Sequence, residues 1–426
     1  MRTDERLVAG IDVGTSGVRA VAIDRDGRVL GRATAAMPAP LVEGAAVSQD
    51  PAIWWSAVES ALHELVNEVG AGRIAALAVD GTSGTLLLTD AAGRPLAAAS
   101  MYDDARAAHL AERIAEAAPP ESGAHGATSP AARLLSMQAD HADAVHAMHQ
   151  SDWIAARLTG RFGVSDDNNA LKLGWDPVAR QWPAWMDRFG LRRDLLPDVV
   201  APGEVVGPAH RAAVDRFRLA ENCVVVAGTT DGCASFLATG AEAIGDGVTA
   251  LGSTLTLKLL SDRPVFAPAH GVYSHRLGAR WLVGGASNTG GKALLRFFSA
   301  ERMAELTPAL DPELPVGLDW HPLAGRGERF PVADPAMIFE AEPRPAEDAR
   351  FFQALLEGIA DVEARAYALL EREGGPPLAS VRSVGGGAVN RAWTAIRAKR
   401  LGVPMPEPAS QEAACGTALL ARRALS

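Results

Sequence analysis

Short apolar runs that end in polar, glycine-rich turns recur along this chain. Leu7–Ile11 is followed by the turn Asp12–Gly17, and Cys223–Ala227, roughly half the chain later, is followed by Gly228–Gly232. Apolar runs of this length, bounded by glycine, predict short buried strands. We expect each turn to lie at the carboxyl end of its strand, where an open α/β sheet exposes backbone N–H groups and its reactive side chains.

Other apolar runs repeat this pattern. The runs that we predict as strands are 18–23, 29–30, 73–80, 85–89, 247–251, 255–260, 281–283 and 381–384. Turns rich in glycine, serine or threonine follow some of them, at Asp80–Gly84, Gly252–Thr254, Gly284–Gly291 and Gly385–Asn390. Aspartate-to-glycine turns at Asp24–Gly27 and 90–93 predict hairpins between neighbouring strands.

Segments with helical periodicity lie between some of these predicted strands. Asp50-Pro51 is a favourable helix start, and apolar residues recur at helical spacing from Trp54 to Val69. A second apolar stripe, from Phe352 to Glu371, predicts a long amphipathic helix. Shorter helices are predicted around 130–139 and 149–158, and from about 390 and about 411. The loop-rich stretch 120–220 suits the walls of a substrate cleft.

The two halves of the chain open alike, with a strand, a turn bearing aspartate or threonine, hairpin strands and then helices. At 426 residues the chain is also too long for one compact core. We therefore predict an α/β protein of two domains, residues 1–237 and 238–426, with the boundary near 235–240. Matching turns that face one another across a cleft would contact phosphate from both sides.

Charge and composition exclude some partners. The chain is 48% apolar and 22% charged, which is ordinary for a globular protein, and its formal net charge is -10. An acidic chain without a concentrated basic stretch is a poor match for nucleic acid or an anionic membrane surface. Arg133, Arg157 and Arg161 are interleaved with acidic residues, and we interpret them as a solvated face.

The cysteines and the N-terminal residues bear on the compartment. Cys223, Cys233 and Cys415 form no Cys-x-x-Cys pair and no zinc spacing, so we expect free thiols in a reducing compartment, the first two as small buried side chains. Only a short apolar run precedes Asp12, unlike a signal peptide, and no apolar run approaches membrane-spanning length. The sequence therefore predicts a cytoplasmic protein.

Two aspartates in the matching turns carry the predicted chemistry. A sugar hydroxyl that attacks a γ-phosphorus must lose its proton, and we assign Asp231 as the acceptor. The alternative is that Asp231 caps the following helix. Asp12, at the phosphate end, suits Mg²⁺ held through water. Gly14, Thr15 and Ser16 add backbone N–H and hydroxyl donors for phosphate.

Further glycine-rich turns could approach a nucleotide with bare backbone. Each of them, taken alone, also fits an ordinary loop. The residues that we assign to nucleotide binding in these turns are Gly252, Ser253, Thr254, Gly285, Gly386, Gly387 and Asn390. The pattern Gly-x4-Gly-Lys-Ser/Thr does not occur, which excludes the P-loop kinases.

The order and spacing of these turns resemble the FGGY carbohydrate kinases of the actin-like ATPase superfamily, over nearly the whole chain. Asp12–Ser16 resembles the family's first phosphate turn, and Gly228–Gly232 resembles the motif that bears its catalytic aspartate. Gly252–Thr254 resembles the hinge-proximal phosphate turn, and Gly385–Gly387 with Asn390 resembles the adenosine motif. The resemblance implies two ribonuclease-H-like domains flanking a cleft, with sugar in the first, nucleotide in the second, and ATP and Mg²⁺ as the phosphate donor and metal.

Four other segments resemble a group of short D-ribulose kinases within this family, which were once labelled xylulose kinases. They are Asp80–Thr85, Met101–Arg106, Ser165–Gly174 and Gly284–Gly291. In that group, residues matching Asp12, Ser83 and Asp231 hold the ketopentose. Ordinary xylulokinases carry a Trp-x-Asp-x-Arg segment where this sequence has Met101–Arg106.

We therefore expect an ATP-dependent ketopentose kinase, with D-ribulose converted to D-ribulose 5-phosphate as the leading reaction. Its partners would be a small sugar and ATP. A xylulokinase or another polyol kinase is the alternative within this class. Outside the class stands a non-kinase member of the same superfamily, such as a nucleotide switch, a filament or an activase. Asp231 favours the kinase because it suits a hydroxyl acceptor, and an iron–sulfur activase would need paired cysteines that this sequence lacks.

Overall fold

The structure, a computed structural model, describes residues 6–425 and divides into two compact units. Unit 1 comprises the chain up to Ala238, His275–Gly278 and the segment that starts at Glu412. Unit 2 comprises Thr239–Ser274 and Ala279–Gln411. Two segments from beyond residue 238 thus belong to unit 1, which no sequence pattern indicated. Within residues 6–425, no helix has both the length and the apolar character that crossing a membrane requires.

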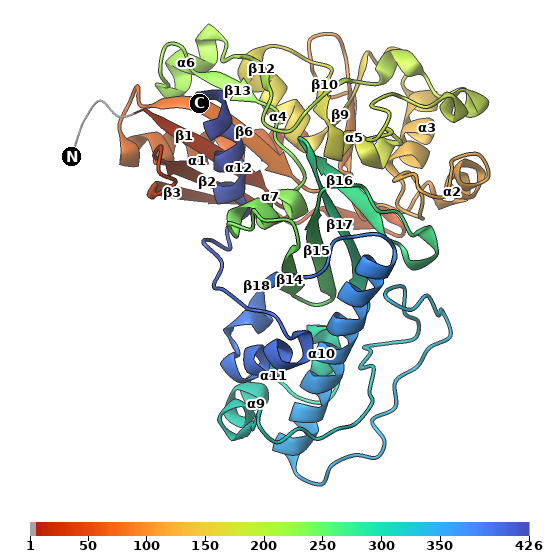
Figure 1. Cartoon of the computed structure of the whole chain (residues 1–426). Helices are drawn as coiled ribbons and strands as arrows, with labels where there is room; N and C mark the ends of the chain where they lie inside the picture. The colour runs from red at the N-terminus through yellow and green to blue at the C-terminus, as the bar shows by residue number, and fades with distance from the viewer. Residues whose placement is uncertain (1–5, 426) are drawn as a thin grey trace. The chain divides into compact units, whose positions relative to one another are not determined.

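A six-stranded sheet forms the centre of unit 1 (Figure 1). In spatial order its strands are β12 (Val205–Pro208), β13 (Val224–Val226), β6 (Ile74–Gly81), β1 (Leu7–Val13), β2 (Gly17–Ile23) and β3 (Val29–Ala36). The strands β1, β2 and β3 pair antiparallel, and β6 runs parallel to both β1 and β13. Every residue of β1 is buried, because the sheet is covered on both faces, and this explains the continuous apolar run Leu7–Ile11.

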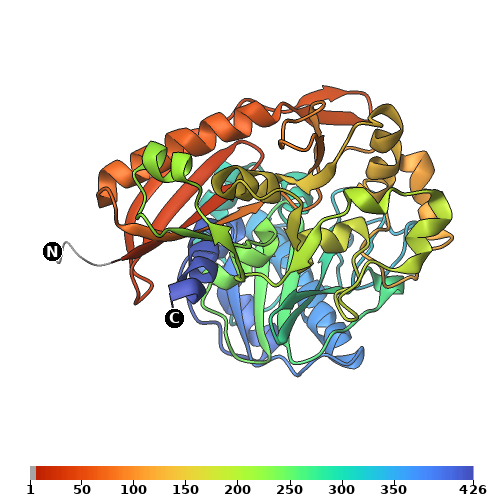
Figure 2. The same cartoon turned by 90° about the horizontal axis from the view of Figure 1, so that it is seen from above.

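Helices cover the two faces of this sheet (Figure 2). The helices α1 (Pro51–Val69) and α4 (Gln150–Thr159) pack on one face, and α7 (Asp231–Ala238) and α12 (Ala413–Arg422) pack on the other. Glycine lets α12 lie directly on β1, since a Cβ at Gly10 would fall 2.0 Å from the Ala414 carbonyl oxygen. Gly416 allows the same approach between α12 and α7, since a Cβ there would fall 1.9 Å from the Ala234 carbonyl oxygen.

A second sheet completes unit 1 together with several helices. In spatial order it contains β4 (Leu41–Glu43), β5 (Ala46–Gln49), β8 (Ala99–Ser100), β7 (Leu86–Thr89) and β9 (His146–His149). A separate core is formed here with α2 (Ala108–Ala115), α3 (Pro130–Asp140) and the end of α5 (Asp167–Leu173). The strands β10 (Val164–Asp166) and β11 (Asp198–Val200) pair with one another, and α6 (Arg211–Phe217) joins the main core. The helices predicted around 130–139 and 149–158 are confirmed as α3 and α4.

The prediction of a solvated basic face is wrong. Arg133 is 1% exposed and donates hydrogen bonds to the backbone carbonyls of Met101 and Gly84. Burial lowers the pKa of Arg133 to about 10. Arg157 is half-buried against tryptophan rings, and only Arg161 of the three is exposed. Hydrogen bonds from the Arg133 guanidinium to backbone carbonyl groups offset the cost of burying it.

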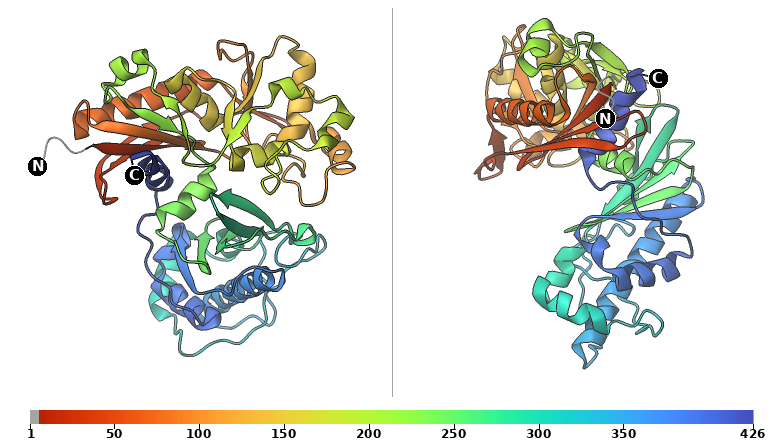
Figure 3. Two further views of the ribbon diagram at one scale, coloured as in Figure 1. Left: turned by 45° about the horizontal axis from the view of Figure 1, so that its top comes forward. Right: turned by 90° about the vertical axis from the view of Figure 1, so that its left-hand side faces the viewer.

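A five-stranded sheet forms the centre of unit 2 (Figure 3). In spatial order it contains β16 (Tyr273–Leu277), β17 (Arg280–Ser287), β15 (Leu255–Ser261), β14 (Asp246–Leu251) and β18 (Ser380–Val384). All of these residues belong to unit 2 except the end of β16, from His275, which is part of unit 1. The strands β14, β15 and β17 pair antiparallel, and β18 runs parallel to β14. This repeats the arrangement of β1, β2, β3 and β6 in unit 1.

The long helix α10 (Asp348–Arg372) builds the core of unit 2. It packs against β15 and β17 through the apolar stripe that the sequence predicted from Phe352 onward. The remaining helices of this unit are α8 (Gly291–Leu295), α9 (Ala300–Leu306) and α11 (Arg391–Leu401). The predicted burial of Cys223 and Cys233 is confirmed, Cys415 is buried as well, and none of the three forms a disulfide.

Candidate active site

Three aspartates meet at one edge of the unit 1 sheet. Asp12 and Asp80 are direct partners in the parallel register of β1 and β6, near the carboxyl ends of both strands. Gly81 pairs with Thr230 in an isolated bridge, which brings the next residue, Asp231, to the same edge. Open α/β sheets bind their ligands at this edge. The two predicted aspartates therefore lie together, and the strand that bears Asp80 lies between them.

Asp80 is completely buried, and its surroundings favour the protonated carboxyl group. Burial raises the pKa of Asp80 well above its usual value, and the nearby charges of Asp12 and Asp231 add to this, whereas a hydrogen bond from Thr417 Oγ1 lowers it in part. Burial also raises the pKa of Asp12, although Arg19, whose Nη1 lies 3.2 Å from Asp12 Oδ2, opposes this. Because two adjacent carboxylates resist ionising together, a proton on Asp80 leaves the negative charge to Asp12.

The turn that bears Asp231 is pressed against β6. A Cβ at Gly228 would fall 1.7 Å from the Val79 carbonyl oxygen, so the backbone approaches as only glycine allows. Asp231 is half-buried and is the first residue of α7, and its Oδ1 accepts the N–H of Gly232 at 2.7 Å. The carboxylate of Asp231 thus accepts one N–H group at the start of α7, which agrees in part with the helix-capping alternative. The negative charge of Asp231 also raises the pKa of Asp80.

The turn after β6 holds the predicted sugar residue Ser83. The backbone N–H and the hydroxyl of Thr82 both donate to Gln150 Oε1, at 3.0 and 2.9 Å. Within the described part of the chain, Ser83 Oγ and Gln150 Nε2 are buried without a hydrogen-bond partner. A buried polar atom left unpaired costs about 1–3 kcal/mol, so a ligand hydroxyl that pairs with these atoms would bind favourably.

The segment Met101–Arg106 lies beside this turn and is held by an ion pair. The N–H of Tyr102 donates to Thr85 Oγ1 at 3.1 Å, which ties the segment to the end of the turn. Arg106 Nε donates to the buried Asp104 Oδ2 at 2.7 Å. Burial acts to raise the pKa of Asp104, but hydrogen bonds, above all from Arg106, outweigh it and hold that pKa below its usual value. Asp104 and Arg106 therefore fix the shape of this wall.

The turn between β1 and β2 carries the other residues predicted in unit 1. Gly14 N–H donates to the Gly17 carbonyl at 3.1 Å and closes the turn. Gly14 and Thr15 are half-buried, and Ser16 is exposed. The turn follows Asp12 directly, so its donors lie at the same edge of the sheet as the aspartates. Phosphate binding by this turn stays a prediction.

Two of the predicted nucleotide turns are neighbours in unit 2. Gly252–Thr254 follows β14, and Gly385–Gly387 follows β18, the parallel partner of β14. Gly385 has a φ of 86°, and a Cβ there would lie 3.0 Å from a carbonyl oxygen of β14. The predicted segment 284–291 joins them, because the N–H of its last residue donates to the Gly252 carbonyl at 2.8 Å.

Two residues assigned to nucleotide binding have structural roles in unit 2. A Cβ at Gly285 would lie 2.7 Å from the ring of Phe330, so packing against that ring explains the glycine. Asn390 is the N-cap of α11: its Oδ1 accepts the N–H of Trp393 at 3.0 Å, and its Nδ2 donates to Thr307 Oγ1 at 3.2 Å. Contact of Gly285 and Asn390 with a nucleotide stays a prediction.

Two polar residues of unit 1 join the site without any signal in the sequence. Thr417 donates to Asp80 although 337 residues separate them in the chain. Gln150 holds the Ser83 turn from the first residue of α4. Both contacts arise from tertiary packing, and no local pattern marks either residue.

A metal ion at this edge would need ligands from outside the protein. Within residues 6–425, no three His, Cys, Asp or Glu side chains are gathered closely enough to hold a metal by themselves. Mg²⁺ in phosphate-transfer sites is commonly bound by one or two carboxylates with phosphate oxygens and water. Asp12 offers a carboxylate of that kind.

Comparison with known proteins places the chain in a family. Residues 7–238 match the N-terminal domain of the FGGY family of carbohydrate kinases, and residues 247–425 match its C-terminal domain. A xylulose kinase of Streptomyces coelicolor is 28% identical over 432 residues, which cover 95% of this chain and 85% of that protein. An autoinducer-2 kinase of Yersinia enterocolitica is 26% identical, over 98% of this chain and 86% of that protein.

A solved structure shares the fold. The crystal structure of xylulose kinase from Rhodospirillum rubrum matches 99% of this chain and 90% of its own with a TM-score of 0.88 at 23% identity. The repeated strand arrangement of units 1 and 2 agrees with the predicted pair of ribonuclease-H-like domains, and the predicted fold class is confirmed. The chain therefore belongs to the FGGY family and is an ATP-dependent carbohydrate kinase, a phosphotransferase with an alcohol group as acceptor.

Proposed function

We propose that this kinase phosphorylates a ketopentose, that D-ribulose is its preferred substrate, and that Asp231 is the general base. The observation that carries the proposal is the meeting of Asp12, Asp80 and Asp231 at one sheet edge of unit 1. The unpaired hydroxyl of Ser83 follows Asp80 closely in the chain and supports a polyhydroxylated ligand there. Sugar binding is assigned to residues 1–237 and nucleotide binding to residues 238–426.

The aspartates divide the work of the reaction. Asp231 accepts the proton of the attacking sugar hydroxyl, because a carboxylate within hydrogen-bond reach is a suitable base. Asp80 keeps its own proton, so the site does not accumulate three adjacent negative charges that would repel the phosphates. Asp12 and Ser83 hold sugar hydroxyls and fix the attacking oxygen in line with the γ-phosphorus, since positioning supplies much of the catalysis in this reaction.

The glycine-rich turns of unit 2 receive ATP. Gly252, Ser253 and Thr254 would contact the phosphates, and Gly386 and Gly387 would lie against the adenosine, with Gly14–Ser16 adding phosphate donors from unit 1. Asp12 would hold Mg²⁺ together with phosphate oxygens, and the ion would neutralise phosphate charge. The use of ATP and the cysteines that form no disulfide with one another support a cytoplasmic location.

D-Xylulose is the second candidate substrate. The relative from Streptomyces coelicolor described above is named a xylulose kinase, which favours this sugar. D-Ribulose is preferred in our proposal because the segments Asp80–Thr85, Met101–Arg106 and Gly284–Gly291 resemble the short D-ribulose kinases. The two sugars differ in the configuration at C3, and a buried polar pocket discriminates strongly when the wrong epimer leaves a group unpaired.

A substrate panel tests the proposal. Purified protein, ATP and Mg²⁺ are combined with D-ribulose, D-xylulose, L-ribulose or glycerol, and ADP release is followed with a coupled assay. D-Ribulose should give the highest kcat/KM. A tenfold higher value for D-xylulose or glycerol would reject D-ribulose while leaving a carbohydrate kinase in place.

A further inference from the structure

Glu328 is a buried carboxylate of unit 2 that receives hydrogen bonds from several directions. Its side chain is 3% exposed. Glu328 Oε2 accepts from Ser287 Oγ and from His321 Nε2, both at 2.6 Å. Glu328 Oε1 accepts the backbone N–H groups of Asn288, at 2.7 Å, and Arg329, at 2.8 Å. One side chain therefore fastens the end of β17 to the segment around residue 328.

The charge of Glu328 supports this role. Burial acts to raise the pKa of Glu328, but the hydrogen bonds from His321, Asn288 and Ser287 outweigh it, and that pKa lies below its usual value. The group is therefore an ionised carboxylate at neutral pH, and it can accept from all of these donors at once.

A chain of hydrogen bonds leads from Glu328 to the turn Gly252–Thr254. Ser287 Oγ accepts the N–H of Thr289 at 3.0 Å, and the Thr289 carbonyl accepts the N–H of Leu255 at 2.8 Å. Two residues further on, the Gly291 N–H donates to the carbonyl of Gly252, the first residue of the turn. The segment 287–291 thus lies between Glu328 and the turn and is bonded to both.

The backbone of segment 287–291 lies in close contact with the turn Gly252–Thr254. Gly290 has a φ of 130°, and a Cβ there would lie 2.8 Å from the carbonyl carbon of Thr254. A Cβ at Gly291 would lie 2.9 Å from the Gly252 carbonyl oxygen. The two segments are in direct backbone contact, so a shift of segment 287–291 would shift the turn.

We propose that Glu328 is a positioning residue for the nucleotide. By holding segment 287–291, it keeps Gly252–Thr254 in the geometry that receives the phosphates of ATP, and it does so without touching the nucleotide. This inference rests on the proposed function, in which that turn binds ATP. Glu328 itself lies outside all of the predicted nucleotide turns.

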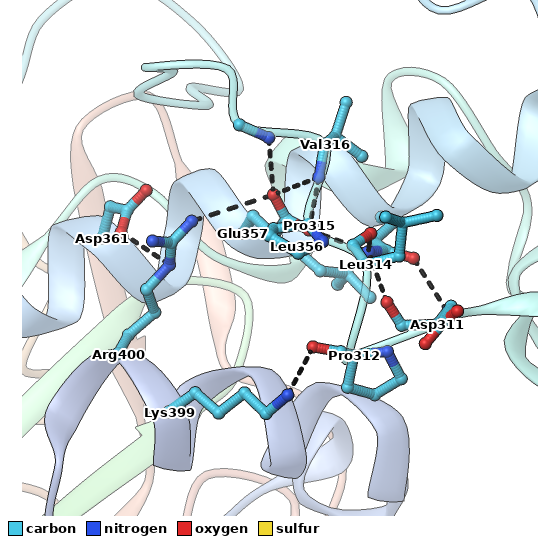
Figure 4. A network of polar contacts seen from close by, with 12 residues as sticks. Asp311, Pro312, Leu314, Pro315, Val316, Leu356, Glu357, Asp361, Lys399 and Arg400 are labelled. Carbon is cyan, nitrogen blue, oxygen red and sulfur yellow. Dashed lines mark hydrogen bonds and ion pairs between the residues drawn. The ribbon is translucent and has the colours of Figure 1, made fainter.

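Another buried glutamate of unit 2 provides a matched control (Figure 4). Glu357 on α10 is 2% exposed and also holds a backbone segment, because it accepts the N–H groups of Val316 at 3.0 Å and Gly317 at 3.2 Å. It accepts Gln353 Nε2 as well, at 2.8 Å. The segment 311–317 carries none of the predicted site residues. Glu357→Ala should therefore cost stability without changing nucleotide affinity.

The experiment compares Glu328→Ala with Glu357→Ala in the full-length chain. Affinities for ADP and for the sugar are measured separately by calorimetric titration, and stability is measured as Tm. Both variants should lower Tm. Glu328→Ala alone should weaken ADP binding, by about tenfold, as expected when a hydrogen-bonded contact is misplaced, and should leave sugar affinity within about twofold. ADP affinity equal to that of Glu357→Ala, or an equal loss of sugar affinity, would overturn the proposal.

Two further variants keep the test decisive. Glu328→Gln retains Oε1 as an acceptor for the backbone N–H groups and should recover most of the ADP affinity; a Gln variant as weak as the Ala variant would contradict positioning by hydrogen bonds. If Glu328→Ala does not fold, Ser287→Ala removes only one of the hydrogen bonds to Glu328, so it should lower Tm without preventing folding and should weaken ADP binding. Unchanged ADP affinity in Ser287→Ala would then overturn the proposal.

A last variant separates this inference from the proposed function. A Cβ at Gly386 would meet nothing within 4 Å, so Gly386→Val should fold and should obstruct the adenosine. Normal ADP binding by Gly386→Val would reject the assigned nucleotide site itself. Lost binding in Gly386→Val together with normal binding in Glu328→Ala would reject only the role of Glu328.

Discussion

At the scale of single residues, the site depends on which of its carboxyl groups carries a proton. Asp80 is buried beside Asp12, and burial and that neighbour raise its pKa. The hydroxyl of Thr417 bonds to Asp80 from the far end of the chain. In the proposed site, the negative charge that would face a metal or a sugar hydroxyl is therefore assigned to Asp12 and Asp231.

Replacing Asp231 by asparagine tests the proposed base. Asp231→Asn keeps the size of the side chain but removes its ability to take a proton, so kcat should fall by at least about 100-fold, the lower limit for loss of a general base. ADP affinity, measured by titration, should stay near that of the wild type. Asp361→Asn, a half-buried aspartate of α10 paired with Arg400, serves as the control and should retain activity. Near-normal turnover by Asp231→Asn would reject the assignment.

Ser83→Ala tests the sugar contact. One lost hydrogen bond costs about 0.5–1.5 kcal/mol, which corresponds to a sugar affinity lower by about 2- to 13-fold. Tm should not fall, because Ser83 Oγ has no partner among the described residues. Ser100→Ala is the contrasting control: its buried hydroxyl donates to Asp104 at 2.6 Å, so its loss should lower Tm. Unchanged sugar affinity together with weaker ADP binding in Ser83→Ala would indicate that Ser83 acts in nucleotide binding and not in sugar binding.

For single glycines and helix caps, the sequence alone could not distinguish a structural role from a contact with a ligand. The sequence predicted Gly285 and Asn390 as nucleotide residues, and this stays a prediction; the structure adds that Gly285 packs against Phe330 and that Asn390 caps α11. A glycine that approaches a ligand and a glycine that approaches an aromatic ring look alike in sequence. The prediction that Arg133 is solvated was wrong because its carbonyl partners come from turns distant in the chain.

At the scale of elements, the pattern of apolar runs and turns predicted most of the strands that matter. The turns after β1, β6, β14 and β18 were all identified, because a buried strand that ends in glycine has a strong local signature. The strand β4 was not predicted, since all of its residues are exposed and no apolar alternation marks it. The packing of α12 on β1 was not predicted either, because only tertiary contacts determine it.

The contact between α12 and α7 should tolerate no side chain at Gly416. A Cβ there would fall 1.9 Å from the Ala234 carbonyl oxygen, so Gly416→Val forces two backbones apart. We expect the free energy of unfolding to fall by about 3 kcal/mol or more, the upper range for overpacking, in chemical denaturation. Gly207→Val is the matched control, since a Cβ at Gly207 meets nothing within 4 Å and stability should hardly change. Equal stabilities of the two variants would contradict this packing.

At the scale of the whole molecule, the two units are not two consecutive halves of the chain. The sequence placed one boundary near residue 238, and the structure adds the segment from Glu412 to unit 1. Four apolar residues of α12, namely Ala414, Ala418, Leu420 and Ala421, are fully buried in this unit. Burying a leucine alone contributes about 1.5–3 kcal/mol, a large share of a typical stability of about 5–15 kcal/mol.

A chain that ends at residue 411 should therefore fail as an enzyme. The truncation removes no residue predicted to touch sugar or nucleotide, but it uncovers one face of the unit 1 sheet and removes Thr417 from Asp80. We expect a loss of cooperative unfolding in unit 1 and no measurable sugar binding, by calorimetry and titration. A chain that stops after residue 425 is the control. Sugar binding by the shorter chain would show that α12 is dispensable.

The return of the chain to unit 1 has a consequence for synthesis. Domains generally fold from the N-terminus as they leave the ribosome, at about 5–20 residues per second. The sheet of unit 1 is made early, but its covering helix α12 is translated only after unit 2. The sheet that carries the three aspartates therefore stays incompletely covered until unit 2 has been translated. A chain whose translation stops before α12 would leave this face of the sheet open to proteases and chaperones.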